Sequence, residues 1–187
     1  MKYQTFDNLH YSGNILLFQE PGLAVFCSRT IPMDLFLPAL DLLKLIMEKE
    51  VTVISGWHSN VEKKLLESRS PNSLSNIVLF LAKGIENYKL PDHLIEDFRN
   101  NKILVASFWE NVVRISKQNA VIRNKAIIQK ADKILFLYIE SNGNLEKIFD
   151  LSITMKKKVF MLDHPSNKKW FEKGALPLSR YNLEAIS

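Results

Sequence analysis

The sequence contains a single cysteine, Cys27, so no disulfide can form within the chain. A reducing compartment is the default for such a chain, and we expect a cytoplasmic protein. No apolar run reaches the ~18 residues that a membrane span requires. The first residues, Met1 to Asp7, contain no apolar signal-peptide core. The sequence therefore predicts no membrane partner.

Several motifs that carry catalysis or hold a cofactor are also missing. The chain has neither a Gly-x-Gly-x-x-Gly run nor a P-loop, and it has no Gly-x-Ser-x-Gly nucleophile turn. Its cysteine and its histidines, at positions 10, 58, 93 and 164, lack zinc-ligand spacing. We therefore expect no metal and no cofactor, and a role without catalysis is favoured.

What the chain does contain is an ordinary globular composition with an uneven charge distribution. Its 187 residues are 47% hydrophobic and 24% charged, with a net charge of +5. The basic excess lies in the C-terminal half. Residues 111–131 include no acidic side chain and hold Arg114, Lys117, Arg123, Lys125 and Lys130. This distribution is more informative about a polyanionic partner than the net charge is.

Short, nearly continuous apolar runs alternate with helical patterns. The runs read as strands buried on both faces and cover residues 23–27, 51–54, 77–81, 103–106, 134–139 and 159–162. The helices are expected at 35–50 with Asp34 as N-cap, 60–68, 91–100, 117–130 and 144–155. This order predicts an α/β fold, a single Rossmann-like domain whose mostly parallel sheet has about six or more strands and helices on both faces. We assign 1–22 to an N-terminal extension, 23–163 to the domain and 164–187 to a C-terminal tail.

In open α/β sheets, ligands bind outside the carboxyl ends of the strands. The loops at these ends combine small residues with basic or aromatic ones, a pattern that suits a phosphate-bearing ligand. The residues concerned are Ser28, Arg29, Ser55, Gly56, Lys83, Gly84, Gly143 and Asn144. Trp57, in the second of these loops, could stack on a base. The alternative is that the small residues are turn and cap residues and that the aromatic ring packs in the core.

The helix expected at 117–130 contains an unusual polar residue. Asn124 falls in the middle of its apolar arc, while Arg123 lies at the edge of the packed face and Lys125 on the other side. With Arg114 and Lys117 these cations would form a track for phosphates. The alternative is a buried amide that ties down a neighbouring loop, beside a solvated basic face.

Taken in order, these segments resemble the DNA-processing protein A (DprA/Smf) family. Gly13-Asn14-Ile15-Leu16-Leu17 resembles its Gly-Asn-x-x-Leu-Leu segment, and Ser28-Arg29 matches the end of its Val-Gly-Ser-Arg, with Cys27 in place of the glycine. Val53-Ile54-Ser55-Gly56 is similar to its Val-Ser-Gly turn, whereas Asn60-Val61-Glu62 stands near the place of its Gly-Ile-Asp. Residues 118–128 resemble its Phe-x-x-Arg-Asn-Arg-x-Ile signature, and 141–145 its Ser-Gly-Ser-Leu loop. The resemblance spans about residues 11–164.

This resemblance implies a Rossmann-like core that binds single-stranded DNA, passes it to a recombinase, forms a homodimer and performs no catalysis. Arg29 and Arg123 would contact phosphates, while Ser28, Gly56 and Asn124 would shape the pocket.

The wider superfamily offers an alternative, a nucleotide-binding protein or a nucleoside-monophosphate phosphoribohydrolase of the lonely-guy type. In that group a Pro-Gly-Gly-x-Gly-Thr-x-x-Glu loop stands where this chain has residues 141–146. Glu146 is the candidate for the catalytic acid under this alternative. The other interpretation of Glu146 is a helix N-terminal carboxylate that favours the dipole.

Overall fold

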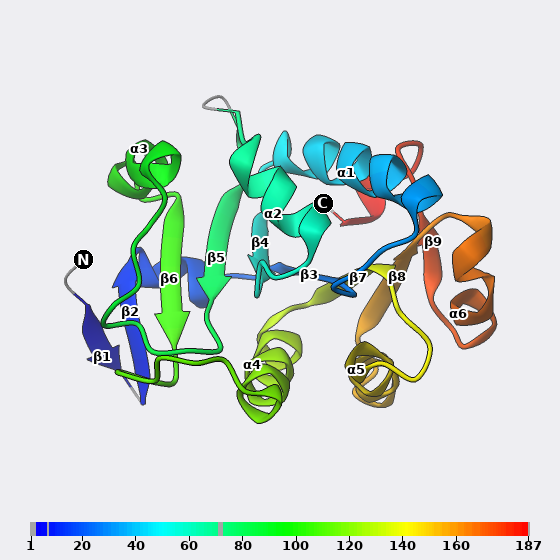
Figure 1. The fold of residues 1–187 in the computed structure, drawn as a ribbon. Coiled ribbons are helices and arrows are strands. Elements are labelled where there is room, and N and C mark those ends of the chain that lie inside the picture. Colours follow the sequence, from blue (N-terminus) through cyan, green and yellow to red (C-terminus); the bar gives the residue numbers. More distant parts are fainter. Residues whose placement is uncertain (1–2, 7, 71–72, 187) are drawn as a thin grey trace.

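The computed structural model describes residues 3–6, 8–70 and 73–186. In this part of the chain a nine-stranded sheet has the order β1-β2-β6-β5-β4-β3-β7-β8-β9 (Figure 1). Strand β2 is antiparallel to both of its neighbours, and all other neighbouring strands are parallel. The strands are β1 (Gln4–Phe6), β2 (Leu9–Gly13), β3 (Leu23–Cys27), β4 (Thr52–Ser55), β5 (Asn76–Phe80), β6 (Ile103–Ser107), β7 (Lys133–Tyr138), β8 (Lys158–Leu162) and β9 (Leu176–Leu178).

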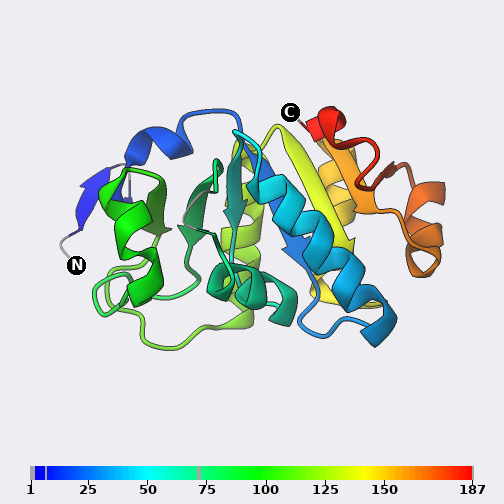
Figure 2. The same ribbon diagram turned by 90° about the horizontal axis from the view of Figure 1, so that it is seen from above.

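Helices cover both faces of this sheet, as Figure 2 shows from above. One face carries α1 (Met33–Met47), α2 (Asn60–Glu67) and α3 (Ile95–Arg99), and the other carries α4 (Lys117–Lys130), α5 (Asn144–Thr154) and α6 (Lys168–Glu172). Short 3-10 turns are η1 (Ile15–Phe18), η2 (Asp92–Leu94), η3 (Pro165–Asn167) and η4 (Leu183–Ile186). The predicted Rossmann-like α/β fold is confirmed. Among the described helices, none has the length and apolar character needed to cross a membrane.

The six apolar runs all form strands, each within one residue of the predicted ends. Their side chains enter two hydrophobic clusters, one on each face, because alternate residues of a strand point to opposite faces. The segments assigned as extension and tail contribute further strands, β1, β2 and β9, to the same sheet. β1 and β2 contain polar residues, and β9 has only three residues with a proline at its centre, so these strands lack the continuous apolar pattern of a central strand. Residues 1, 2 and 187 lie outside the described residues.

Two helix predictions were wrong in detail. Helix α1 begins at Met33 after the extended Pro32, so Asp34 is a first-turn residue and not the N-cap. There its carboxylate still faces the positive end of the helix dipole. The single helix expected at 91–100 is divided into η2 and α3, with Pro91 as the residue that precedes the first turn.

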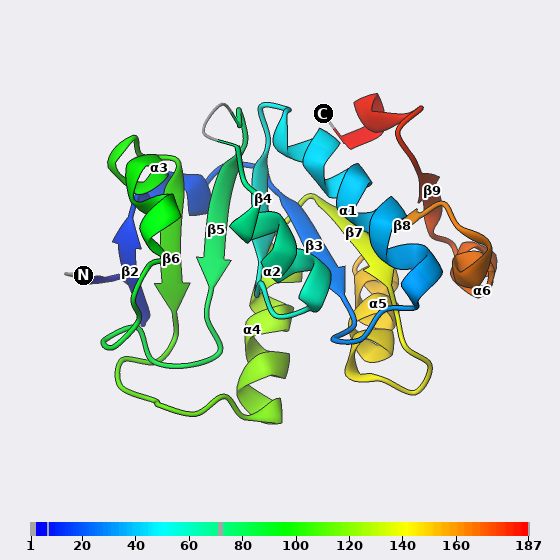
Figure 3. The ribbon, with the colours of Figure 1, turned by 45° about the horizontal axis from the view of Figure 1, so that its top comes forward.

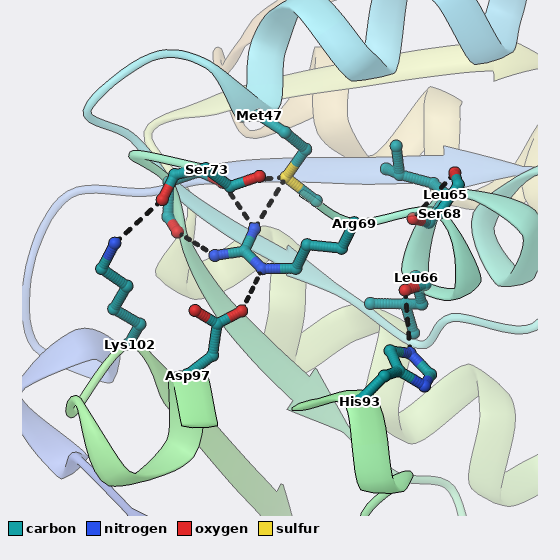
Figure 4. A network of polar contacts seen from close by, with 10 residues as sticks. Met47, Leu65, Leu66, Ser68, Arg69, Ser73, His93, Asp97 and Lys102 are labelled. Atoms are coloured by element: carbon teal, nitrogen blue, oxygen red, sulfur yellow. Dashed lines mark hydrogen bonds and ion pairs between the residues drawn. The ribbon is translucent and has the colours of Figure 1, made fainter. Parts of the chain in front are cut away.

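The sheet end remote from the strand carboxyl ends is fixed by a buried ion pair (Figure 4). Arg69, after α2, donates from Nε to Oδ2 of Asp97 on α3 at 2.6 Å. The same guanidinium donates to the Ser75 carbonyl at 2.6 Å and to the Ser75 hydroxyl at 2.9 Å. Its three nitrogens therefore join α2, α3 and the start of β5, and this cation is fully used inside the fold.

Candidate nucleic-acid interface

The carboxyl ends of the parallel strands and the N-termini of α2, α4 and α5 meet at one edge of the sheet (Figure 3). Strand β3 has β4 on one side and β7 on the other, which makes the β3–β7 boundary the topological switch point. Ligand crevices of open α/β sheets form at this position. The predicted site residues follow the strands at this edge, so the fold brings their loops together.

At the switch point, Ser28 ties the two loops together. Its hydroxyl accepts the backbone N–H of Glu140 at 2.8 Å, and its own N–H donates to the Tyr138 carbonyl at 2.9 Å. Ser28 is buried, whereas Arg29 beside it is exposed to solvent. Gly143 is the N-cap of α5 and Asn144 its exposed first residue. Arg29 is thus the group at this boundary that is free to meet an anion.

The loop after β4 is held by a buried carboxylate. Glu62 accepts the Ser55 hydroxyl and the Ser59 N–H, and Ser59 caps α2 in a capping box. Trp57 adopts a positive φ of 53°, is 7% exposed and donates its indole N–H to the Val78 carbonyl at 3.0 Å. Its ring is packed in the core of the α1 face, which is the alternative that the sequence left open. Ser55 and Trp57 therefore stabilise the conformation of this loop.

Arg123 lies deeper than the sequence indicates. Its side chain is 4% exposed, and Nη1 donates to the Phe80 carbonyl at 2.9 Å. Gly56 gives the guanidinium room, because a Cβ there would stand 1.7 Å from Nη1. Burial lowers the pKa of Arg123 to about 10, and the charge of Glu62 opposes this shift. Arg123 thus joins the ends of β4 and β5 from within, not at the edge of the packed face.

The loop after β5 is supported by the loop after β6. Gly84 donates its N–H to the Val112 carbonyl at 2.6 Å, and a Cβ on Gly84 would stand 2.5 Å from backbone atoms of that loop. The Ser107 hydroxyl donates to the Lys83 carbonyl at 2.6 Å. The Lys83 ammonium lies 5.6 Å from the ring centroid of Tyr88. Gly84 is therefore a packing residue, and Lys83 is the partly exposed cation of this loop.

Cations from four elements act on His58 at this edge. Burial lowers the pKa of His58 to about 4, and Arg123, Lys63, Lys83 and Arg29 lower it further through their charges. These cations come from α4, α2 and the loops after β5 and β3. The buried Nε2 of His58 has no hydrogen-bond partner, and the ring lines a cavity of about 180 Å³. In the described residues, no ion pair neutralises Arg29, Lys63 or Lys83.

Lys63 was missed by the sequence reasoning. It is exposed and follows Glu62 in the first turn of α2. The capping pattern Ser59-x-x-Glu62 directly after a strand run could have indicated it, since this pattern starts a helix at the ligand edge.

The remaining predicted cations lie along α4 and just before it. Arg114 is exposed before the start of α4, Lys117 is its exposed first residue, and Lys125 is exposed two turns further on. Asn124 is 8% exposed and points into the packed face, as its place in the apolar arc predicted. Arg29, Lys83 and Arg123 thus act together on the pKa of His58, and Lys125 lies farther along the helix.

Glu146 occupies the first turn of α5 as an ordinary ionised carboxylate. It accepts the Asn142 N–H at 2.9 Å and the Lys173 ammonium at 3.4 Å. The Asn142 N–H and then Lys173 lower the pKa of Glu146. A general acid needs a raised pKa, so nothing here favours the phosphoribohydrolase alternative. The described residues also include no cluster of metal-ligating side chains.

A further cavity lies away from this edge. It measures about 590 Å³ at the amino ends of β3, β4 and β7, where Glu20, Glu50 and Asp132 are among its lining residues. Carboxylates repel phosphate groups, so this cavity does not suit a polyanion.

These features define a Rossmann-like protein with a cationic edge at the strand carboxyl ends. Residues 3–181 match the model of the family described as DNA recombination-mediator protein A, and the chain belongs to that family. The resemblance seen in the sequence is therefore confirmed. A search of curated proteins finds no match to this chain.

Solved structures show the same fold. DNA processing protein A from Streptococcus pneumoniae is 17% identical with a TM-score of 0.76, over 95% of this chain and 65% of that one. This chain thus spans 65% of the pneumococcal protein. The Helicobacter pylori protein, described by its single-stranded DNA binding mode, is 16% identical with a TM-score of 0.75, over 98% of this chain and 92% of that one. A molybdenum cofactor binding protein from Rippkaea orientalis is more distant, at 13% identity and a TM-score of 0.55, over 89% and 94%.

Proposed function

We propose that this protein binds single-stranded DNA at the carboxyl edge of its sheet and performs no catalysis. The observation that carries the proposal is that Arg29, Lys63, Lys83 and Arg123, from four elements that meet at this edge, all lower the pKa of His58, which lines a cavity there. Four cations from four elements create a field that attracts the closely spaced phosphates of a nucleic acid. Family membership and the single-stranded DNA described for the Helicobacter pylori protein support the same ligand.

The exposed cations have distinct roles in this proposal. Arg29, Lys63 and Lys83 contact phosphates, and Arg114, Lys117 and Lys125 continue the track along α4. Arg123 acts as a positioning residue, because its buried guanidinium holds the ends of β4 and β5 and adds charge from below. Ser28, Ser55, Gly56, Gly84 and Asn124 shape the surface from within, while Gly143 and Asn144 offer the N-terminus of α5.

Homodimerisation, delivery of DNA to a recombinase and a cytoplasmic location are further parts of the proposal. The family description as a recombination mediator supports a recombinase partner. The single buried cysteine is consistent with a reducing compartment. Sedimentation of the protein with and without oligonucleotide tests the dimer.

The direct test is fluorescence anisotropy with a labelled single-stranded oligonucleotide at low salt. We expect binding that a nucleoside monophosphate at equal nucleotide concentration does not displace, since one phosphate contacts only part of the track. Arg29→Ala should weaken binding, while Lys44→Ala, which removes an exposed cation of α1, should not. No binding at low salt, or displacement by the mononucleotide, would overturn the proposal.

A further inference from the structure

A second surface of the molecule is unlike the cationic edge. On the face that carries α4, helices cover the sheet from α4 toward β8, but toward β6 and β2 the cover is only the four-residue η1 (Figures 1 and 2). Strands of a parallel sheet are normally covered on both faces. A groove of about 440 Å³ remains between α4 and η1.

The floor of this groove is apolar. Leu9, Phe18 and Ala126 are buried beneath it, and Ile15 and Phe108 are half-buried in its walls. Ile122, one turn before Ala126 on the same side of α4, is 42% exposed, and Leu16 of η1 is 56% exposed. Both elements that flank the groove thus carry an exposed large apolar side chain, as expected of a protein-docking surface.

The charge within the described lining of the groove is positive. Lys130 is the one ionisable residue among its described lining, and its ammonium lies 5.1 Å from the Phe18 ring centroid. At the end of α4, Lys157 donates to the carbonyls of Ala131 at 2.8 Å and Gln129 at 3.2 Å. Lys125 is exposed on the outer side of α4, and residues 111–131 contain no carboxylate. A ligand of the groove thus meets an apolar floor with the Lys130 ammonium in its lining.

This combination selects among possible occupants. A DNA strand would place charged phosphates against an apolar floor, which costs desolvation without pairing them. A second copy packed by a two-fold axis would bring Lys130 and Lys125 near their own images, in a protein of net charge +5. An amphipathic segment with carboxylates beside its apolar face can pack on the apolar floor and pair with the Lys130 ammonium.

We propose that the groove between α4 and η1 binds an acidic amphipathic helix of another protein. The apolar side chains of that helix lie against Phe18 and Phe108, beside Ile122, and its carboxylates face Lys130. Lys117, at the DNA-binding end of α4, and Lys130 are separated by roughly 20 Å of helix, at the usual rise per residue. The groove and the cationic edge can therefore be occupied together.

The test uses a fluorescein-labelled synthetic peptide with leucine and phenylalanine on one helical face and glutamate on the other. A second peptide carries lysine in place of each glutamate. We expect saturable binding of the acidic peptide only. Ile122→Glu should weaken it at least about tenfold, and Lys130→Glu about tenfold with a loss of salt dependence. Leu37→Glu, a matched change at a side chain that is 64% exposed on α1, should leave binding unchanged.

Three results would overturn the proposal. The acidic and basic peptides could bind alike, or Ile122→Glu, with an unchanged thermal transition, could bind the acidic peptide as the wild type does. Sedimentation could show a wild-type dimer that Ile122→Glu abolishes, which would assign the groove to a second copy. Displacement of the peptide by oligonucleotide, with displacement lost in Ile122→Glu, would assign the groove to DNA. If Ile122→Glu still binds the oligonucleotide, a loss of peptide binding in this variant concerns the groove and not the proposed DNA-binding function.

Discussion

Arg123→Ala should lower the free energy of unfolding, because the Arg123 side chain is buried and acts within the fold. The guanidinium is 4% exposed and donates to the Phe80 carbonyl at 2.9 Å, with the charge of the 3% exposed Glu62 nearby. A hydrogen bond from a buried charged donor is worth about 1.5–3 kcal/mol, and the nearby charge of Glu62 favours the upper end of this range. Glu62 keeps two other hydrogen bonds, so we expect a loss of about 3 kcal/mol in the free energy of unfolding.

Urea denaturation measures this loss. With a slope of about 2 kcal/mol/M, the midpoint should fall by about 1.5 M. Arg29→Ala is the matched control, because it removes the same side chain at the same edge from an exposed position. It should change stability by less than about 0.5 kcal/mol. The reasoning would be refuted if Arg123→Ala were as stable as the wild type and weakened oligonucleotide binding with the same loss of salt dependence as Arg29→Ala.

Other substitutions test the same loops. Gly56→Ala should displace the Arg123 guanidinium and destabilise the wild type, but cost little in an Arg123→Ala background, and equal costs in a double-mutant cycle would exclude this contact. The pKa of His58 is held at about 4, below its ordinary 6.5, so the unfolded chain gains a proton first as the pH falls. The free energy of unfolding should therefore be greatest above pH 6.5, and His58 should lower it by about 3 kcal/mol between that pH and pH 4. In urea denaturation at several pH values, His58→Asn should show a smaller decline. An equal decline in both proteins would contradict the pKa assigned to His58. Trp57→Phe removes the bond to the Val78 carbonyl and should lower stability by about 1 kcal/mol while leaving oligonucleotide affinity unchanged. A loss of affinity of about 1–3 kcal/mol in the anisotropy assay would instead show that Trp57 stacks on a base.

The central strands could be predicted because a strand buried on both faces has a continuous apolar sequence. The runs 23–27 and 134–139 are continuous and apolar, and both became strands of the sheet centre. The outer strands have no such continuous apolar run. β1 and β9 have three residues each, and β9 contains Pro177, which a central strand would not tolerate.

The sequence predicted which loops lie together at the candidate site, but not how deeply their side chains are buried. Strand order places the loops at one edge, and the helical period placed Asn124 inward, as the structure shows. The helical period could not show that Arg123 is buried, because its space comes from Gly56 and its acceptor from Phe80, both distant in sequence. For the same reason the hydrogen bond of Trp57 to Val78 and the effect of Lys63 on the pKa of His58 depend on tertiary packing.

The most direct test of the central claim is the salt dependence of oligonucleotide binding, measured by anisotropy. If about four phosphates are neutralised at the carboxyl edge, log affinity should fall with log salt at a slope near −3. Replacing Arg29 and Lys117 together by alanine should reduce the magnitude of this slope by about 1.4. Replacing Lys44 and Lys49, exposed in and just after α1, should leave it unchanged. Absence of binding, or equal slopes for the two double variants, would contradict the account.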